Sequence, residues 1–119
     1  MFIYQLKIQI KQNKLDEFAI SLHSFLPKIC SQKGCLDFRA YQDIERENMY
    51  IVVGEWKTHQ AMEKHFTTHD FEVLIGAAVV LGETFEMKIT EVLKTGGLEL
   101  ARERISPVGS VRLPGRTNR

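Results

Sequence analysis

The chain begins with an alternation of apolar and polar side chains, MFIYQLKIQIK, in which Ile3 is the exception. A period of two is typical of a strand that buries one face, and the apolar set here is Phe2, Tyr4, Leu6, Ile8 and Ile10. From Leu15 to Ile29 the apolar positions change to helical spacing, which predicts an amphipathic helix. Asn13 is the predicted N-cap of this helix and Gly34 its predicted C-cap.

A second alternation covers Leu36 to Tyr41 and is followed by a polar stretch, residues 42–48. The run from Met49 to Trp56 is rich in β-branched and aromatic residues, as strands are. Two such runs joined by a short polar segment predict an antiparallel hairpin.

Helical spacing returns after Thr58, which is the predicted N-cap of a short helix. Thr67 and Thr68 interrupt the spacing, and a further helix is predicted up to Gly82. Alternation then resumes, with Phe85, Met87 and Ile89 on one face, and predicts a fourth strand that runs to about Lys94.

The resulting order, β-α-β-β-α-β with a broken second helix, predicts an α+β fold of the ferredoxin-like type, in which helices cover one face of a four-stranded antiparallel sheet. No further element is left to cover the other face. We therefore expect a homodimer in which two sheets pack together into a closed β-barrel. Residues 1–94 form the predicted domain, and residues 95–119 form an extension with a short helix and an arginine-bearing tail that we expect to lie on the partner subunit.

The composition of the chain argues against several classes of function. A net charge of +1 over 119 residues does not predict binding to nucleic acid. No apolar stretch approaches the ~20 residues of a membrane span, and the N-terminus lacks the features of a signal peptide, so we expect a cytoplasmic protein. Cys30 and Cys35 are interpreted as reduced, partly buried thiols, since C-x4-C without a second ligand pair is a poor zinc signal.

The stretch EWKTHQAMEKHFTTHDF, residues 55–71, holds three of the four histidines. The spacing of His65 from Ala61 and Met62 points its ring toward the core. A buried histidine is either a structural residue satisfied by a neighbour or a group near neutral pKa that accepts a proton. A metal site of His65, His69 and Glu55 or Asp70 is not predicted, because Thr67–Thr68 breaks the helix between the two histidines.

Five features of this pattern resemble the antibiotic biosynthesis monooxygenase family over about residues 1–94: Gly34–Cys35 before the second strand, Trp56 at the end of the third, then His65, Thr68 and Phe71. The resemblance implies a dimeric α+β barrel and a small-molecule substrate. It also implies chemistry without a cofactor, although reactions in this family vary on one scaffold.

Cofactor-free oxygenation requires a proton acceptor, a group that stabilises the substrate anion, and exclusion of water. His65 is the predicted proton acceptor. Trp56 and Phe71 are the predicted walls for a flat ring, Arg39 the predicted partner of the anion, and His69 a further substrate contact. We expect the site inside each subunit, between the sheet and the broken helix.

The chain departs from the family pattern at two places. Gly54 stands where an acidic residue is common, and the neighbouring Glu55 points to the opposite face of the strand. His69–Asp70 stands where a proline and a histidine are common. Three hypotheses therefore remain open: a cofactor-independent monooxygenase of quinols or phenols, an isomerase that moves a proton on a small hydroxyketone, and a stress-linked or regulatory binding module without catalysis.

Overall fold

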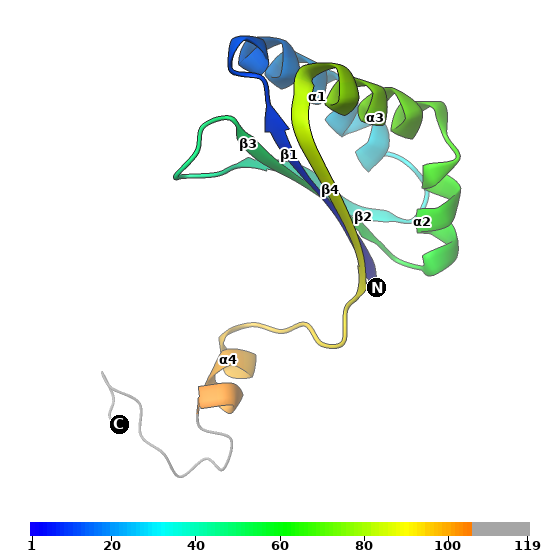
Figure 1. The fold of residues 1–119 in the computed structure, drawn as a ribbon. Helices are drawn as coiled ribbons and strands as arrows, with labels where there is room; N and C mark the ends of the chain where they lie inside the picture. Colours follow the sequence, from blue (N-terminus) through cyan, green and yellow to red (C-terminus); the bar gives the residue numbers. More distant parts are fainter. Residues whose placement is uncertain (106–119) are drawn as a thin grey trace.

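The structure is a computed structural model, and it describes residues 1–105. Its four strands form one antiparallel sheet in the order β2-β3-β1-β4. The predicted ferredoxin-like fold is confirmed, including the break in the second helical segment (Figure 1). The elements are β1 (Phe2–Ile10), η1 (Gln12–Lys14), α1 (Leu15–Cys30), β2 (Cys35–Gln42), β3 (Met49–Trp56), α2 (His59–Phe66), α3 (His69–Leu81), β4 (Gly82–Glu91) and α4 (Leu98–Ile105).

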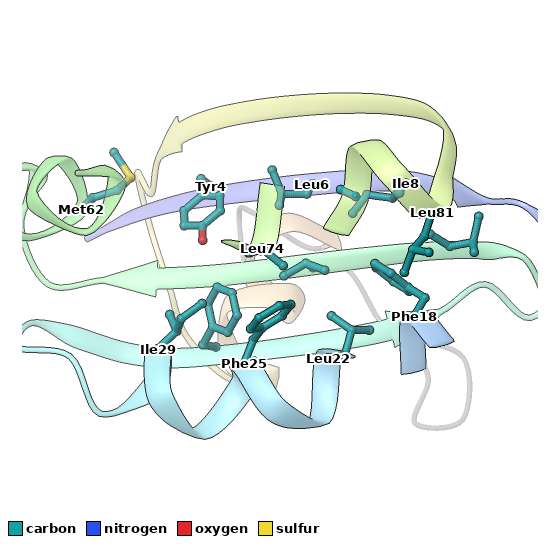
Figure 2. Packing of buried hydrophobic residues seen from close by; sticks show 14 of the residues in the cluster. Tyr4, Leu6, Ile8, Phe18, Leu22, Phe25, Ile29, Met62, Leu74 and Leu81 are labelled. Atoms are coloured by element: carbon teal, nitrogen blue, oxygen red, sulfur yellow. The ribbon is translucent and has the colours of Figure 1, made fainter. Parts of the chain in front are cut away.

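The core lies between the sheet and the helices α1 and α3, which cover the same face of the sheet (Figure 1). β1 is one of the two central strands, and its predicted alternation is confirmed, because Tyr4, Leu6, Ile8 and Ile10 are all fully buried while Lys7 is exposed. Figure 2 shows apolar side chains of α1, among them Phe18 and Leu22, in the same core as Leu6 and Ile8 of this strand.

The two predicted caps of α1 are wrong. Asn13 lies within the 3-10 turn η1, and Lys14 precedes the helix without a side-chain capping bond. The helix ends at Cys30, and its C-cap is Ser31 rather than Gly34. Gly34 has a different role: its φ of 85° favours glycine, and a Cβ there would clash with Ala61 of α2. Gly34 thus allows the turn before β2 to approach α2 closely.

The break between α2 and α3 is confirmed at the predicted threonines. Thr58 caps α2, and its hydroxyl accepts a hydrogen bond from the backbone N–H of Ala61 at 3.1 Å. Thr68 caps α3 by accepting from the N–H of Phe71 at 3.2 Å, while its own hydroxyl donates to the carbonyl of His65 at 2.7 Å. Thr68 therefore ties the end of one helix to the start of the next.

β4 forms an edge of the sheet and ends at Glu91, three residues before the predicted end. Phe85 and Ile89 pair with Ile8 and Tyr4 of β1, so they face the helix side, yet about half of each side chain is exposed. The predicted short helix in the extension is confirmed as α4, and the arginine-bearing tail beyond it, residues 106–119, lies outside the described residues.

The face of the sheet opposite the helices is mixed in character. Ile3 and Gln5 of β1 lie beside Glu55 and Val53 of β3 on this face, and Lys7 lies beside Ile51. The homodimer that would cover this face stays a prediction. No helix among residues 1–105 is both long enough and apolar enough to cross a membrane.

Candidate functional site

His65 lies in the last turn of α2, with its side chain turned into the core as predicted. Only 1% of the residue is exposed, and it is the one buried polar residue among residues 1–105. Its ring stacks on Trp56 with a centroid distance of 4.5 Å and an interplanar angle of 24°. Phe71 meets the same ring edge-on at 5.2 Å. The imidazole therefore sits in an aromatic environment that excludes water.

Both ring nitrogens of His65 have hydrogen-bond partners. Nε2 lies 2.7 Å from the hydroxyl of Tyr4, which extends from β1 into the core (Figure 2). Nδ1 lies 2.7 Å from Oε1 of Gln32, in the turn between α1 and β2. The amide nitrogen of Gln32 donates in turn to Oδ2 of Asp70 at 3.4 Å. Tyr4, His65, Gln32 and Asp70 form one continuous set of contacts, which we call the His65 chain.

Burial controls the charge of the two titratable groups at the inner end of the His65 chain. It lowers the pKa of His65 to about 4, although the nearby Asp70 carboxylate acts in the opposite direction. It also raises the pKa of Tyr4 well above its ordinary value, with a smaller contribution from Cys35. Both groups are therefore neutral at pH 7. A neutral imidazole keeps one unprotonated nitrogen, which is the state that a proton acceptor requires.

A hollow of about 310 Å³ meets one edge of the His65 ring. None of its lining residues belongs to a strand; they are Gln32, Lys33, Ala61, Lys64, His65, Thr68, His69 and Asp70. The hollow thus lies among the α1–β2 turn, α2 and the start of α3, rather than between the sheet and the helices where we expected it. On the sheet side, the space around the imidazole is occupied by the rings of Tyr4, Phe38 and Trp56.

A second hollow, of about 510 Å³, lies at the junction of α2 and α3. It shares Thr68 and His69 with the first, and its remaining lining residues are Phe66, Thr67, Phe71, Glu72 and Ile75. Phe66 and Phe71 also pack against Tyr4, with centroid distances of 5.1 and 5.8 Å. These two rings therefore form a wall between the second hollow and the Tyr4 side chain.

The structure brings together three of the four predicted substrate contacts. Trp56 and Phe71 touch the His65 ring, and His69 lies at the rim of both hollows, where its side chain is 82% exposed and lies 3.4 Å from Glu72. Arg39 is not part of this group. It lies on the opposite face of β2 from the buried Phe38, its side chain is 66% exposed, and it pairs with Asp37 at 3.1 Å. Arg39 is therefore not placed to contact an anion beside His65.

Gly54 has a packing role. A Cβ at this position would lie 2.9 Å from Trp56 Nε1 and 2.9 Å from Tyr4 Cε2, which is too close for either contact. The absence of a side chain thus lets the Trp56 and Tyr4 rings lie against the strand. Trp56 Nε1 is buried and has no hydrogen-bond partner among the described residues. The acidic residue that the family pattern has here would not fit without displacing these rings.

Tyr4 and Gln32 were not among the predicted site residues. Tyr4 carried a usable signal, because a tyrosine on the buried face of a strand needs a hydrogen-bond partner for its hydroxyl. Gln32 carried no such signal, because a polar residue in a turn is ordinary. Its partners His65 and Asp70 lie 33 and 38 residues further along the chain.

The two cysteines lie near the Gln32 turn and remain free thiols. Cys35 is half-buried as expected, whereas Cys30 is exposed, which corrects the expectation of a buried thiol there. Burial raises the pKa of Cys35 to about 11, with a further contribution from Cys30. A thiol with so high a pKa is a weak nucleophile at neutral pH. Within residues 1–105, no three His, Cys, Asp or Glu side chains are grouped as metal ligands.

Comparison with known proteins identifies one protein family. The profile described as "Antibiotic biosynthesis monooxygenase" matches residues 1–76. An uncharacterized protein of Synechocystis is 26% identical over 89 residues, which span 74% of this chain and 60% of that protein. YcnE of Bacillus subtilis, which carries the provisional name of a monooxygenase, is 25% identical over 72 residues, which span 60% of this chain and 76% of YcnE.

The fold has many solved counterparts. One is a mutant of SnoaB of Streptomyces nogalater, a protein described as a cofactor-independent oxygenase. It aligns with a TM-score of 0.72 at 16% identity, covering 81% of this chain and 96% of SnoaB. At this level of identity the likeness shows a shared fold.

Proposed function

Since the chain belongs to the antibiotic biosynthesis monooxygenase family, we propose that it is a cofactor-independent monooxygenase of a small quinol, phenol or other enolisable compound, with His65 as the proton acceptor. The observation that carries the proposal is the environment of His65. It is a neutral imidazole, buried among aromatic rings and hydrogen-bonded on both nitrogens, and one edge of its ring meets a hollow.

The proposed reaction needs no external reductant. The substrate loses a proton to His65, and the resulting anion is electron-rich enough to react with molecular oxygen. One oxygen atom enters the substrate, where a CH₂ group becomes a carbonyl, and the other leaves as water together with the two hydrogens. The substrate supplies all four electrons that reduce the two oxygen atoms, so the protein has to take the proton, hold the anion and keep bulk water away.

The described residues provide these functions in part. A low pKa makes His65 a weak base, but the same burial strengthens the attraction between an imidazolium and a substrate anion formed beside it. Phe71 supplies a flat apolar surface in the second hollow, whereas Trp56 lines neither hollow and stacks on the His65 ring. Both hollows fall within the size range of about 300–1,000 Å³ that is usual for small ligands. Because Arg39 lies elsewhere, the imidazolium that forms at His65 replaces it as the proposed partner of the anion.

We further propose that the protein acts as a homodimer. The sheet face opposite the helices includes Ile3, Ile51 and Val53, and in a single chain this face has no covering element among residues 1–105. Packing against a second copy would remove these side chains from water. Sedimentation at micromolar concentration tests this, and a well-folded monomer would contradict it.

The test of the activity is oxygen uptake by the purified protein with a panel of quinols and anthrone-like phenols. We expect replacement of His65 by Gln to reduce turnover by roughly 10²- to 10⁴-fold, the usual contribution of a general base. His23→Gln is the matched control, since His23 is exposed on α1, and it should leave turnover unchanged.

Two outcomes would contradict the proposal. Equal oxygen uptake by the wild-type and His65→Gln proteins would remove His65 from the reaction. Turnover that persists without oxygen would favour the isomerase hypothesis, which requires the same proton acceptor and no oxygen.

A further inference from the structure

Gln32 occupies a fixed place in the turn between α1 and β2. Its backbone N–H donates to the carbonyl of Ile29 at 3.0 Å, and its own carbonyl accepts from the N–H of Cys35 at 3.1 Å. The half-buried side chain extends from this turn and lies between His65 on α2 and Asp70 on α3. Three separate parts of the chain therefore meet at one amide group.

The orientation of that amide follows from Asp70. An ionised carboxylate only accepts hydrogen bonds, so the group that faces it at 3.4 Å has to be the NH₂ of Gln32. The carbonyl oxygen of Gln32 then faces His65 Nδ1 at 2.7 Å, and this oxygen also only accepts. With the amide reversed, two acceptors would face each other at the Asp70 end.

The protonation of the imidazole follows from the amide. Since Gln32 Oε1 accepts, Nδ1 carries the proton of the neutral ring and donates it to Gln32. Nε2 is then left with a free lone pair, which accepts the hydroxyl proton of Tyr4 at 2.7 Å. Each of the three hydrogen bonds in the His65 chain thereby acquires a direction.

We propose that Gln32 is a positioning residue for the reaction: oriented by Asp70, it holds His65 in the tautomer whose proton-accepting atom is Nε2. This inference rests on the proposed function, because it assigns the atom of His65 that takes the substrate proton. Gln32 itself acts only through the imidazole.

The route of the proton follows from this assignment. Because Nε2 faces the Tyr4 hydroxyl, a proton reaches it through that hydroxyl. The O–H bond of Tyr4 breaks as its proton bonds to Nε2, and the phenol oxygen takes a proton from the substrate in the same step. The products are a substrate anion and an imidazolium whose Nδ1–H still donates to Gln32. Tyr4 is fully buried behind Phe66 and Phe71, so a substrate in the second hollow has to displace the Phe71 ring to reach it.

Nitrogen NMR of histidine-labelled protein tests the tautomer directly. We expect His65 in the wild type to show a protonated Nδ1 and an unprotonated Nε2 at pH 7. Asp70→Asn replaces a group that only accepts by an amide that can accept or donate, so it no longer fixes the orientation of the Gln32 amide, and we expect a mixture of tautomers in this variant. A wild-type spectrum with the proton on Nε2 would overturn the proposal without any variant being made.

A charge exchange tests whether Gln32 acts on the imidazole itself. In the double variant Gln32→Glu with Asp70→Asn, the net charge is conserved, but the carboxylate moves into direct contact with Nδ1–H. We expect the pKa of His65, followed by NMR, to rise by about 1 to 3 units, the range typical of a directly paired charge. The titratable groups that stay unchanged are Tyr4 from β1, which bonds to His65, Cys35 from β2, which lies near Tyr4, and three residues that line the first hollow with His65: Lys33 from the turn, Lys64 from α2 and His69 from α3.

Gln12→Glu is the matched control. Gln12 also donates to a carboxylate, that of Glu47 at 2.8 Å, but it lies in the turn after β1 and does not contact His65. We expect this variant to leave the His65 signals unchanged. A double variant with an unshifted His65 titration would show that Gln32 is only a spacer. Both readouts are independent of oxygen uptake, so loss of the proposed activity and loss of the tautomer assignment are separate outcomes.

Discussion

The two ends of the core differ in chemistry although the same sheet underlies both. At the end formed by Ile8, Ile10, Phe18 and Leu81, every buried side chain is apolar. At the other end, Tyr4 and His65 are buried among aromatic rings and are linked by hydrogen bonds to Gln32 and Asp70. Burial of polar groups costs free energy unless they are paired. The second end therefore depends on its hydrogen bonds, whereas the apolar end depends on packing alone.

The difference between the two ends of the core indicates that the function lies at the His65 end. The apolar end is explained by packing, and its residues need no role beyond it. The His65 end combines a neutral imidazole, two neighbouring hollows and a broken helix capped by Thr68. Changes at the apolar end should lower stability and leave the site intact, whereas changes at the His65 end should alter protonation as well.

The largest expected effect lies at the apolar end. Phe18 is fully buried and meets Tyr50 edge-on at 5.1 Å, so Phe18→Ala should lower the free energy of unfolding by about 3–5 kcal/mol. Phe85→Ala is the matched control, because Phe85 is 43% exposed and its loss should cost far less. Denaturant unfolding measures both. Equal losses would show that the apolar end is not the stable part of the core.

The next effect is the pH dependence of stability at the His65 end. The folded pKa of His65 is about 4 and its ordinary value is 6.5, so between these values the unfolded chain binds more protons than the folded one. Stability should therefore fall as the pH drops from 6.5 toward 4, by up to about 1.4 kcal/mol per pH unit. The measured quantity is the difference between wild type and His65→Gln. A difference that does not vary with pH would contradict the buried neutral imidazole.

A smaller effect is expected from the hydrogen bond between Tyr4 and His65. Tyr4→Phe keeps the ring but leaves His65 Nε2 buried without its donor, which should cost about 1–3 kcal/mol of unfolding free energy. Tyr41→Phe is the matched control, since Tyr41 is 53% exposed on β2 and should lose almost nothing. If both variants are equally stable, the hydroxyl of Tyr4 is not held by His65.

Local periodicity in the sequence predicts part of the fold, and the rest depends on contacts between distant residues. The strand alternation, the break at Thr67–Thr68 and the inward direction of His65 follow from local periodicity, and all three are confirmed. Local pattern failed at Asn13, where a 3-10 turn takes the place of a capped helix start, and at Gly34, where contact with Ala61 matters rather than a helix end.

The site was harder to predict because its parts are distant in the chain. Trp56, Phe71 and His65 lie within one short stretch and were identified together. Gln32 lies 33 residues from His65, and Tyr4 lies 61 residues from it, so no spacing joins them. Arg39 was assigned to the site from its residue type, and only the pairing of β2 with β3 reveals that it faces away.

One titration tests the central claim that His65 is a buried neutral imidazole set apart from the rest of the protein. NMR of the four histidines across pH 3.5 to 8 compares His65 with His23, His59 and His69, which are all exposed. We expect His65 to stay neutral down to about pH 5 and to titrate with a pKa of about 4. If His65 titrates near the ordinary histidine value of 6.5, the ring is solvated, and the proposed proton acceptor and its hydrogen-bonded chain are wrong.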